Sequence, residues 1–110
     1  MNKVPLTLLS LQQLVESEKN AHNRLIVLDC YADWCGPCKR IAPEVERIPS
    51  LYEGRVIVLK TNIDESDDIA ESFAIQSLPT FLFFKYGTVV NRIEGANLDI
   101  LHDTIRMYVS

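Results

Sequence analysis

The sequence predicts an α/β fold in which a mixed central β-sheet is flanked by helices. Strand-like and helix-like segments alternate along the 110 residues in the order β-α-β-α-β-α-β-β-α. Because connections of helix length separate the first strands, those strands should pair in parallel. Only a tight turn separates the last two strands, which predicts an antiparallel hairpin at one end of the sheet.

The first strand and the first helix are short. Three leucines, Leu6, Leu8 and Leu9, predict a strand near the start of the chain. Ser10 is a favourable helix N-cap, because its side-chain oxygen can accept a hydrogen bond from a backbone N–H of the first turn. The residues that follow at helical spacing are Leu11, Leu14, Val15 and Glu18.

Residues 25–31 predict the second strand, and a longer helix follows it. The strand is an apolar and β-branched run that one charge, Asp29, interrupts, so it should be buried on both faces. Pro43 and Pro49 lie inside the helix, where each removes a backbone hydrogen bond. We therefore expect a kink near Pro43 and a weakened end at Pro49. The helix starts at Pro37, and its apolar face is formed by Ile41, Val45, Ile48 and Tyr52.

The second half of the chain predicts three more strands and two helices. Residues 55–62 form a strand and residues 67–74 a short helix. Residues 80–85 and 89–94 form a hairpin that turns at Tyr86 and Gly87. A last helix begins after Asn97, and its buried stripe is formed by Leu98, Leu101, Ile105, Tyr108 and Val109.

The composition predicts one globular domain, residues 1–110. Hydrophobic residues make up 47% of the chain and charged residues 24%, which suits a chain that buries a core. Eleven Lys and Arg against fifteen Asp and Glu give a net charge of -4, so nucleic acid and anionic lipid are not expected partners. No apolar run is long enough to predict a membrane span. No large unpaired apolar stripe is visible, which favours a monomer.

The start of the chain and the cysteine count bear on the compartment. Lys3 and residues 4–11 have some features of a secretory signal, but Pro5 and two hydroxyl residues interrupt the apolar stretch. Three cysteines, two of them three positions apart, do not suit the disulfide framework of a small secreted protein. We therefore expect a protein of the reducing cytoplasm.

The clearest chemistry lies where the buried strand ends and the second helix begins, at Trp34-Cys35-Gly36-Pro37-Cys38-Lys39. Unpaired N–H groups and the helix dipole lower the pKa of a thiol at a helix N-terminus, so Cys35 should form a nucleophilic thiolate. Pro37 suits the first helical turn and stiffens the link between the two sulfurs. Cys38, one turn later, should be the buried resolving thiol.

A zinc site and an inert core pair are the other interpretations of these cysteines. Zinc requires four ligands, and the remaining candidates, Cys30, His22 and His102, are not at a supporting spacing. An inert pair would not need Gly-Pro between the thiols or a neighbouring Trp. A redox-active dithiol without a bound metal is therefore favoured.

A pattern of residues extends over nearly the whole chain: it comprises residues 25–39, Ile41-Ala42-Pro43, residues 60–64, Leu78-Pro79-Thr80, residues 84–87 and Gly95-Ala96. In its order and spacing this pattern resembles that of the thioredoxin family. The resemblance implies a thioredoxin fold and a protein disulfide reductase that binds no cofactor. By this likeness, Cys35 attacks the target disulfide, Cys38 resolves the mixed disulfide, and a thioredoxin reductase uses NADPH to reduce the protein again.

Asp29 is the candidate proton acceptor. An ionised carboxylate is costly inside an apolar strand, so the pKa of Asp29 should rise. The resemblance matches Asp29 with the family's buried acid, which implies that it accepts the proton of Cys38; a carboxylate satisfied by hydrogen bonds is the alternative. The resemblance also makes Lys60 the expected partner of Asp29, although a lone Lys in a strand is typical of a surface residue.

The resemblance also implies a surface that binds protein substrates. In the family, the peptide bond that corresponds to Leu78-Pro79 is cis and faces the sulfurs; a trans proline at a strand start is the alternative. The Leu78 backbone would pair with an extended segment of the substrate, as in strand addition. The expected substrate-binding residues are Trp34, Gly36, Pro37, Leu78, Pro79, Thr80, Gly95 and Ala96.

Cys30 departs from the family pattern, which usually has an aromatic residue at this position. Neighbouring strand residues face opposite sides, so Cys30 should point away from Asp29 and into the other core of the sheet. We expect either a small core residue or a regulatory or dimer-forming thiol.

A thiol oxidant or isomerase and a redox-silent binding module are also compatible with this fold. Gly-Pro between the cysteines is similar to reducing members of the superfamily, whereas oxidants and isomerases usually carry His before the second cysteine. A silent module would be expected to lose Cys35, Cys38 or Asp29, and all three are present. Reduction of protein disulfides is therefore favoured.

Overall fold

In residues 5–109, which a computed structural model describes, the predicted order of strands and helices is confirmed. The strands are β1 (Leu6–Thr7), β2 (Leu25–Tyr31), β3 (Val56–Asn62), β4 (Thr80–Lys85) and β5 (Thr88–Glu94). The helices are α1 (Leu11–Lys19), α2 (Gly36–Leu51), α3 (Asp67–Ser72) and α4 (Leu98–Tyr108). Lys3 and Val4, where the signal-like stretch begins, lie outside the described residues.

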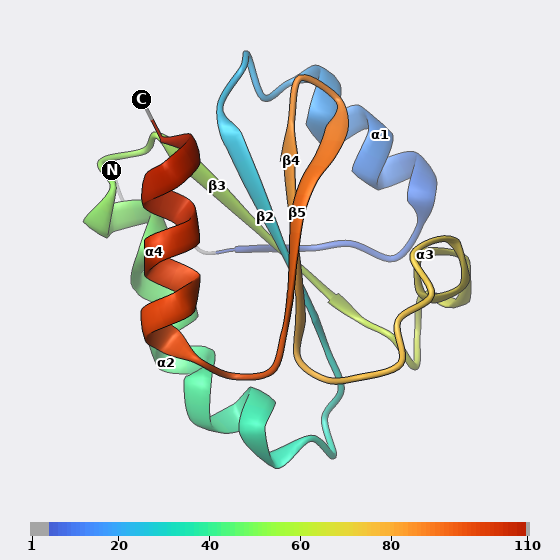
Figure 1. Cartoon of the computed structure of the whole chain (residues 1–110). Helices are drawn as coiled ribbons and strands as arrows, with labels where there is room; N and C mark the ends of the chain where they lie inside the picture. The colour runs from blue at the N-terminus through green and yellow to red at the C-terminus, as the bar shows by residue number, and fades with distance from the viewer. Residues whose placement is uncertain (1–4, 110) are drawn as a thin grey trace.

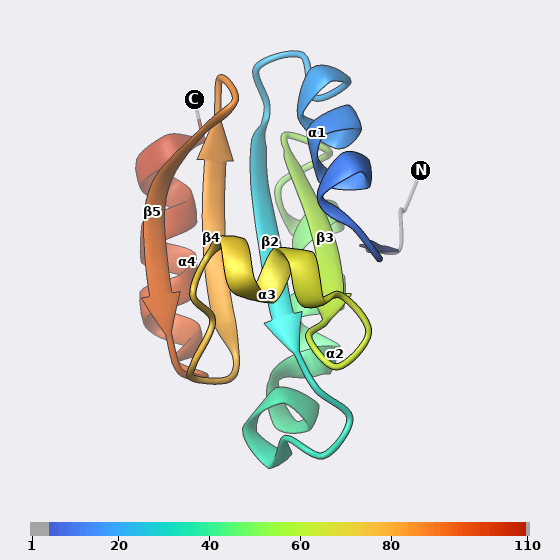
Figure 2. The ribbon, with the colours of Figure 1, turned by 90° about the vertical axis from the view of Figure 1, so that its right-hand side faces the viewer.

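The strands form one mixed sheet in the spatial order β1-β3-β2-β4-β5. β1 and β2 each pair with β3 in parallel and β4 pairs with β5 in an antiparallel hairpin, as the lengths of the connections predict. The antiparallel pairing of β4 with β2 does not follow from those lengths, because a connection that contains a helix also precedes β4. Figure 1 shows α2 and α4 on one face of this sheet and α1 and α3 on the other. In Figure 2 the same sheet is seen from the side of α1 and α3.

Each face of the sheet carries its own apolar core, and β2 contributes to both. Leu25 and Val27 pack in the core that contains residues of α2 and α4, while Leu28 and Cys30 pack in the core with residues of α1 and α3. This alternation follows from the period of two in a β-strand. Asp29 therefore faces α2, and Cys30 is fully buried on the opposite side, as predicted.

Helix α2 agrees with the prediction at its start and differs at its end. It begins at Gly36, with Pro37 in the first turn, and its ribbon bends after the first turns, as Pro43 predicts (Figure 1). The helix then continues through Pro49 to Leu51, so Pro49 does not end it. The ring of Pro49 is buried, and this packing offsets the lost backbone hydrogen bond.

The first strand is shorter than expected. It has only two residues, and both are exposed. Of the three leucines that predict it, only Leu8 is buried, whereas Leu6 and Leu9 are exposed. An edge strand needs little burial, because the backbone hydrogen bonds to β3 define it.

The topology brings four chain segments to one end of the sheet. β2 and β3 are parallel and in register through Tyr31 and Asn62, so both carboxyl ends lie there. β4 starts opposite Cys30 with Thr80, and α2 begins a few residues after β2. The cysteine pair therefore lies at this end of the molecule.

Candidate active site

A disulfide bond joins Cys35 and Cys38, whose Cα atoms are 5.3 Å apart. Cys35 is the N-cap of α2, and its Sγ accepts a hydrogen bond of 3.2 Å from the backbone N–H of Cys38. This is the position at the start of the helix that the sequence predicts. In the reduced protein, such a donor and the positive end of the helix dipole favour a thiolate at Cys35.

The disulfide lies in a small apolar cluster at the end of the sheet. Cys35 and Cys38 are 4% and 5% exposed, and Ala32 completes the buried part of the cluster. Tyr31, Ile63 and Leu78 pack against it. Leu78 precedes β4, so the segment between α3 and β4 is in direct contact with the redox-active residues.

The carboxyl of Asp29 is buried beside Cys38. Both residues line a cavity of about 290 Å³ between the end of the sheet and α2. Asp29 is 3% exposed, and among the described residues its Oδ1 has no hydrogen-bond partner. Burial disfavours the charged form and raises the pKa of Asp29 from 3.8 to about 7, while the positive charge of Lys60 acts in the opposite direction. The rise that the sequence predicts is therefore found.

Lys60 lies on the neighbouring strand, in register with Asp29, and lines the same cavity. It makes no ion pair with Asp29 in the part of the chain that the structure describes. Its Nζ instead lies 4.7 Å from the centroid of the Tyr31 ring, a cation–π contact. Lys60 thus influences the Asp29 carboxyl through the electric field of its charge.

The peptide bond between Leu78 and Pro79 is cis. Two hydrogen bonds hold this segment: the Gly95 N–H donates to the Pro79 carbonyl at 2.8 Å, and the Thr80 hydroxyl donates to the Ser77 carbonyl at 2.6 Å. Pro79 and Thr80 are buried. Ala96, the neighbour of Gly95, is partly buried against the core on the α2 side of the sheet.

Trp34 is the large apolar residue exposed next to the disulfide. Its side chain is 68% exposed, and its indole Nε1–H donates to the Asp64 carboxylate at 2.8 Å. Gly36 and Pro37 are also exposed at the start of α2. Together with Leu78, these residues offer an uncharged surface beside the sulfurs.

Other features of the described residues point to no second chemistry. Residues 5–109 contain no group of three or more His, Cys, Asp or Glu side chains that could hold a metal ion. None of the described helices has the length and apolar character to span a membrane. A larger pocket of about 390 Å³ lies between α1, the start of β2 and the β4–β5 hairpin, and none of the predicted site residues lines it.

Comparison with known proteins agrees with this geometry. A sequence model described as Thioredoxin matches residues 6–107. The chain belongs to the thioredoxin family. Among solved structures, Fasciola hepatica thioredoxin superposes with a TM-score of 0.90 at 35% identity, and the match covers 94% of this chain and 98% of that one. The thioredoxin fold is thereby established.

The curated relatives of this thioredoxin-family chain include longer proteins. Thioredoxin-T of Drosophila melanogaster is 47% identical over 82% of this chain and 55% of the fly protein. A peptide-N(4)-(N-acetyl-beta-glucosaminyl)asparagine amidase of Caenorhabditis briggsae is 44% identical over 84% of this chain and 15% of the worm protein. The chain thus spans about half of the first relative and a small part of the second.

The thioredoxin-family residues that the sequence singles out lie at one end of the molecule. The structure brings Asp29 to Cys38 and Leu78 to the disulfide, but it does not pair Lys60 directly with Asp29. Sequence reasoning missed the bond from Trp34 to Asp64. Asp64 follows β3, whose carboxyl end lies beside that of β2 in a parallel pair, so this position could have been suspected.

Proposed function

We propose that this protein reduces protein disulfides by dithiol–disulfide exchange. The Cys35 thiolate attacks one sulfur of the target disulfide, forms a mixed disulfide and releases the other target sulfur. Cys38 then gives up its proton and attacks the Cys35 sulfur, which releases the second target thiol and forms the Cys35–Cys38 bond. Two electrons pass from the dithiol to the target. The observation that carries the proposal is the Cys35–Cys38 disulfide at the N-terminus of α2, beside a buried carboxyl.

Asp29 is the group that accepts the proton of Cys38 in this proposal. Its pKa of about 7 lets the carboxyl exist in both protonation states near neutral pH, which is what a general base requires. The two residues share a cavity, which supports a transfer between them. The charge of Lys60 keeps the pKa of Asp29 from rising further.

The substrate-binding surface in this proposal surrounds the disulfide. The exposure of Trp34 and the contact of Leu78 with the cysteine cluster support it. An extended substrate segment would pair with the Leu78 backbone, as in strand addition. The residues assigned to this site at the surface are Trp34, Gly36, Pro37, Leu78, Gly95 and Ala96. Pro79 and Thr80, also assigned to the site, are buried and would hold the Leu78 backbone from beneath.

The partners in this proposal are protein disulfides and a thioredoxin reductase that uses NADPH. Family membership supports both assignments. One similar solved structure, 33% identical, comes from work on the thiol resolving mechanism of a yeast mitochondrial 1-Cys peroxiredoxin via glutathione and thioredoxin systems. By analogy, oxidised peroxide-reducing enzymes are one class of target. The protein would act as a monomeric electron carrier in cytoplasmic redox homeostasis.

Two substitutions test the order of the cysteines. Cys38→Ser should trap mixed disulfides with targets, because the resolving thiol is missing, and Cys35→Ser should abolish exchange. Both variants are made in a Cys30→Ala background, so that no third thiol contributes. Each is incubated with oxidised or with reduced insulin, and the products are identified by mass spectrometry. Activity in Cys35→Ser would show that the assignment of the nucleophile is wrong.

The reduction potential of the pair separates the three candidate functions. In a defined dithiothreitol or glutathione buffer, a reductase should equilibrate at a potential more reducing than the glutathione pool. A potential near that of the secretory compartment would indicate an oxidant or isomerase. The absence of reversible exchange would leave only a binding module.

A further inference from the structure

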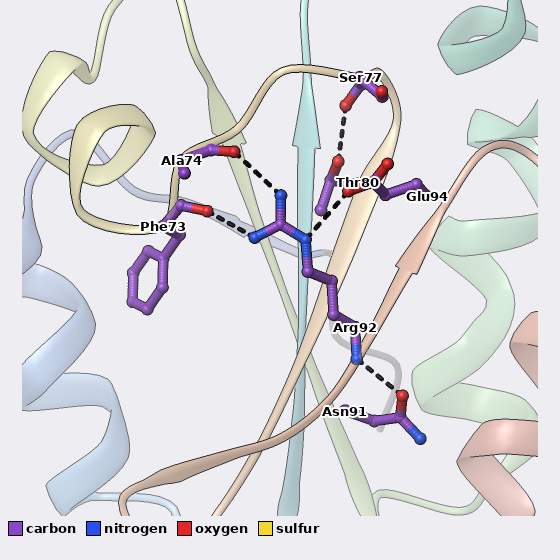
Figure 3. Close-up of polar contacts among 7 residues, drawn as sticks. All are labelled: Phe73, Ala74, Ser77, Thr80, Asn91, Arg92 and Glu94. Carbon is purple, nitrogen blue, oxygen red and sulfur yellow. Dashed lines mark hydrogen bonds and ion pairs between the residues drawn. The ribbon is translucent and has the colours of Figure 1, made fainter.

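Arg92, on β5, joins that strand to the end of α3. Its two Nη atoms donate to the backbone carbonyls of Phe73 and Ala74, and the bond to Ala74 is 3.0 Å long. Its Nε donates to the Glu94 carboxylate at 3.2 Å. Figure 3 shows the guanidinium between these three acceptors. All three guanidinium nitrogens are therefore engaged, and the side chain is held in one orientation.

The two carbonyls that Arg92 binds lie just after α3. The helix has six residues and ends at Ser72, and the amides of Phe73, Ala74 and Ile75 already donate to the carbonyls of its last turn. Ala74 has a φ of 49°, a left-handed conformation that is strained for a residue with a Cβ. The planar guanidinium carries donors at fixed angles, so one Arg can hold two successive carbonyls. Arg92 thus stabilises the turn in which the chain leaves α3.

This turn begins the segment that carries the cis peptide bond. Arg92 holds the segment at residues 73 and 74, and the Gly95 N–H holds it at the Pro79 carbonyl. Both anchors belong to one stretch of chain, β5 and the residue after it. Leu78 lies between the anchors and packs against the cysteine cluster. The position of the Leu78 backbone therefore depends on how firmly the segment is tied to β5 at each end.

We propose that Arg92 is a positioning residue for substrate binding, because it fixes the segment 73–79 so that the Leu78 backbone can pair with an extended protein substrate. The inference rests on the proposed disulfide reduction and deepens it. Arg92 acts through the segment and takes no part in the exchange of sulfurs. A small disulfide that needs only access to Cys35 should not depend on Arg92, whereas a protein disulfide should.

The test compares two substrates in single-turnover reactions of the reduced protein. Insulin serves as the protein disulfide and 5,5′-dithiobis(2-nitrobenzoate) as the small one. Arg92→Ala should lower the second-order rate constant for insulin about 5-fold through loss of alignment, and change the rate for the small disulfide less than about 1.5-fold. The rate constant of Arg92→Lys for insulin should fall between those of wild type and Arg92→Ala, because an ammonium group cannot reproduce the paired donors of a guanidinium.

Two matched variants separate the carbonyl contacts from charge. Glu94→Gln removes the ion pair but leaves the guanidinium on the two carbonyls, so insulin reduction should stay near the wild-type rate. Arg106→Ala removes a positive charge from an exposed side chain on α4, which is paired with Asp103. It should also leave the rate unchanged. A loss in either variant as large as that of Arg92→Ala would contradict the proposal.

Amide hydrogen exchange gives a readout that does not depend on activity. The Ile75 N–H donates to the Ala70 carbonyl and the Gly95 N–H to the Pro79 carbonyl. Both amides should exchange faster in Arg92→Ala, while amides in the middle of β2 should not. Unchanged exchange at both positions would overturn the proposal. This result is distinct from a failure of the proposed function, which would appear as a wild-type protein that reduces neither substrate. Equal losses of rate for insulin and the small disulfide would overturn the proposal for Arg92 as well. If Arg92→Ala does not fold, Arg92→Lys provides the same comparisons.

Discussion

Asp29 carries the energetic cost of the proposed chemistry. Its carboxyl is buried without a hydrogen-bond partner for Oδ1 among the described residues, and the charge of Lys60 offsets part of the loss of hydration. A residue chosen for stability alone would be neutral here. The site keeps a group that ionises near neutral pH, which is the property that the proposed proton transfer requires.

Replacing Asp29 with Asn should stabilise the fold at neutral and alkaline pH. The pKa of about 7 in the folded protein exceeds 3.8, so the folded state binds more protons between these values and the unfolding free energy falls as pH rises through that window. Three pKa units correspond to about 4 kcal/mol, expressed in full above pH 7. Urea unfolding should show little difference between wild type and Asp29→Asn near pH 4, and several kcal/mol in favour of the variant near pH 8.

The exposed Asp33, which lines the same cavity, provides the control. Asp33→Asn should show neither the gain in stability nor its pH dependence. The same pair of variants tests proton transfer: at pH 7, Asp29→Asn should resolve mixed disulfides more slowly, and Asp33→Asn should not. A stability difference that does not vary with pH would show that burial does not raise the pKa of Asp29.

The sequence predicted those site residues that interrupt a hydrophobic pattern or stand at the boundary between two elements. Asp29 interrupts an apolar strand, and Cys35 and Cys38 stand where a strand gives way to a helix. Arg92 leaves no such trace, because its acceptors are backbone carbonyls 18 and 19 residues away, and a carbonyl is present whatever the side chain. The bond from Trp34 to Asp64 spans 30 residues and is equally invisible in local spacing.

At the scale of elements, α1 and α3 are joined at their N-termini. The Asp68 carboxylate, in the first turn of α3, accepts a hydrogen bond of 2.8 Å from the Leu11 N–H at the start of α1. Ser10 caps the same helix by accepting from the Gln13 N–H at 3.3 Å. Two free donors of α1 are thus satisfied, one locally and one by another element.

Asp68→Ala should destabilise the protein by about 1 kcal/mol, because it removes a charged cap from a helix N-terminus. Urea unfolding measures this loss, and faster exchange of the Leu11 amide locates it. Asp67→Ala is the matched control: Asp67 is also in the first turn of α3 but makes no side-chain hydrogen bond within residues 5–109. If both variants lost the same free energy, the dipole of α3 would explain the effect and the link to α1 would contribute nothing.

Local signals predicted where helices begin better than where they end. Ser10 and Asn97 cap α1 and α4 as expected, since each accepts a hydrogen bond from a residue three positions later. The end of α2 depends on the burial of Pro49, which only the assembled core determines. The two-residue length of β1 likewise depends on its pairing with β3, a partner some fifty residues away in the register Leu6 to Leu59.

At the scale of the whole molecule, one sheet lies between two apolar cores and packs against both of them. β2 lies in the centre of the sheet and contributes alternate side chains to both cores, and the cysteine pair follows its carboxyl end. The alternation of segments predicted this three-layer arrangement, because helix-length connections leave few ways to pair the strands. Tight coupling of the two cores should keep the short segments around the disulfide in place.

Substitutions on opposite faces of β2 test this coupling. Val27 and Leu28 are both fully buried, and they belong to the α2 and α1 sides of the sheet respectively. Leu28→Ala should cost about 3 kcal/mol and Val27→Ala about 2 kcal/mol, through lost burial and the cavity left behind. In each variant, thermal unfolding should remain a single transition, with far-UV and near-UV circular dichroism changing together and Tm falling by about 4 °C for each kcal/mol. Val89→Ala, at an exposed position of β5, should change Tm little.

If either variant, Leu28→Ala or Val27→Ala, unfolded in two steps, one face of the sheet could open while the other stayed folded. Two-step unfolding would therefore show that β2 does not couple the two cores.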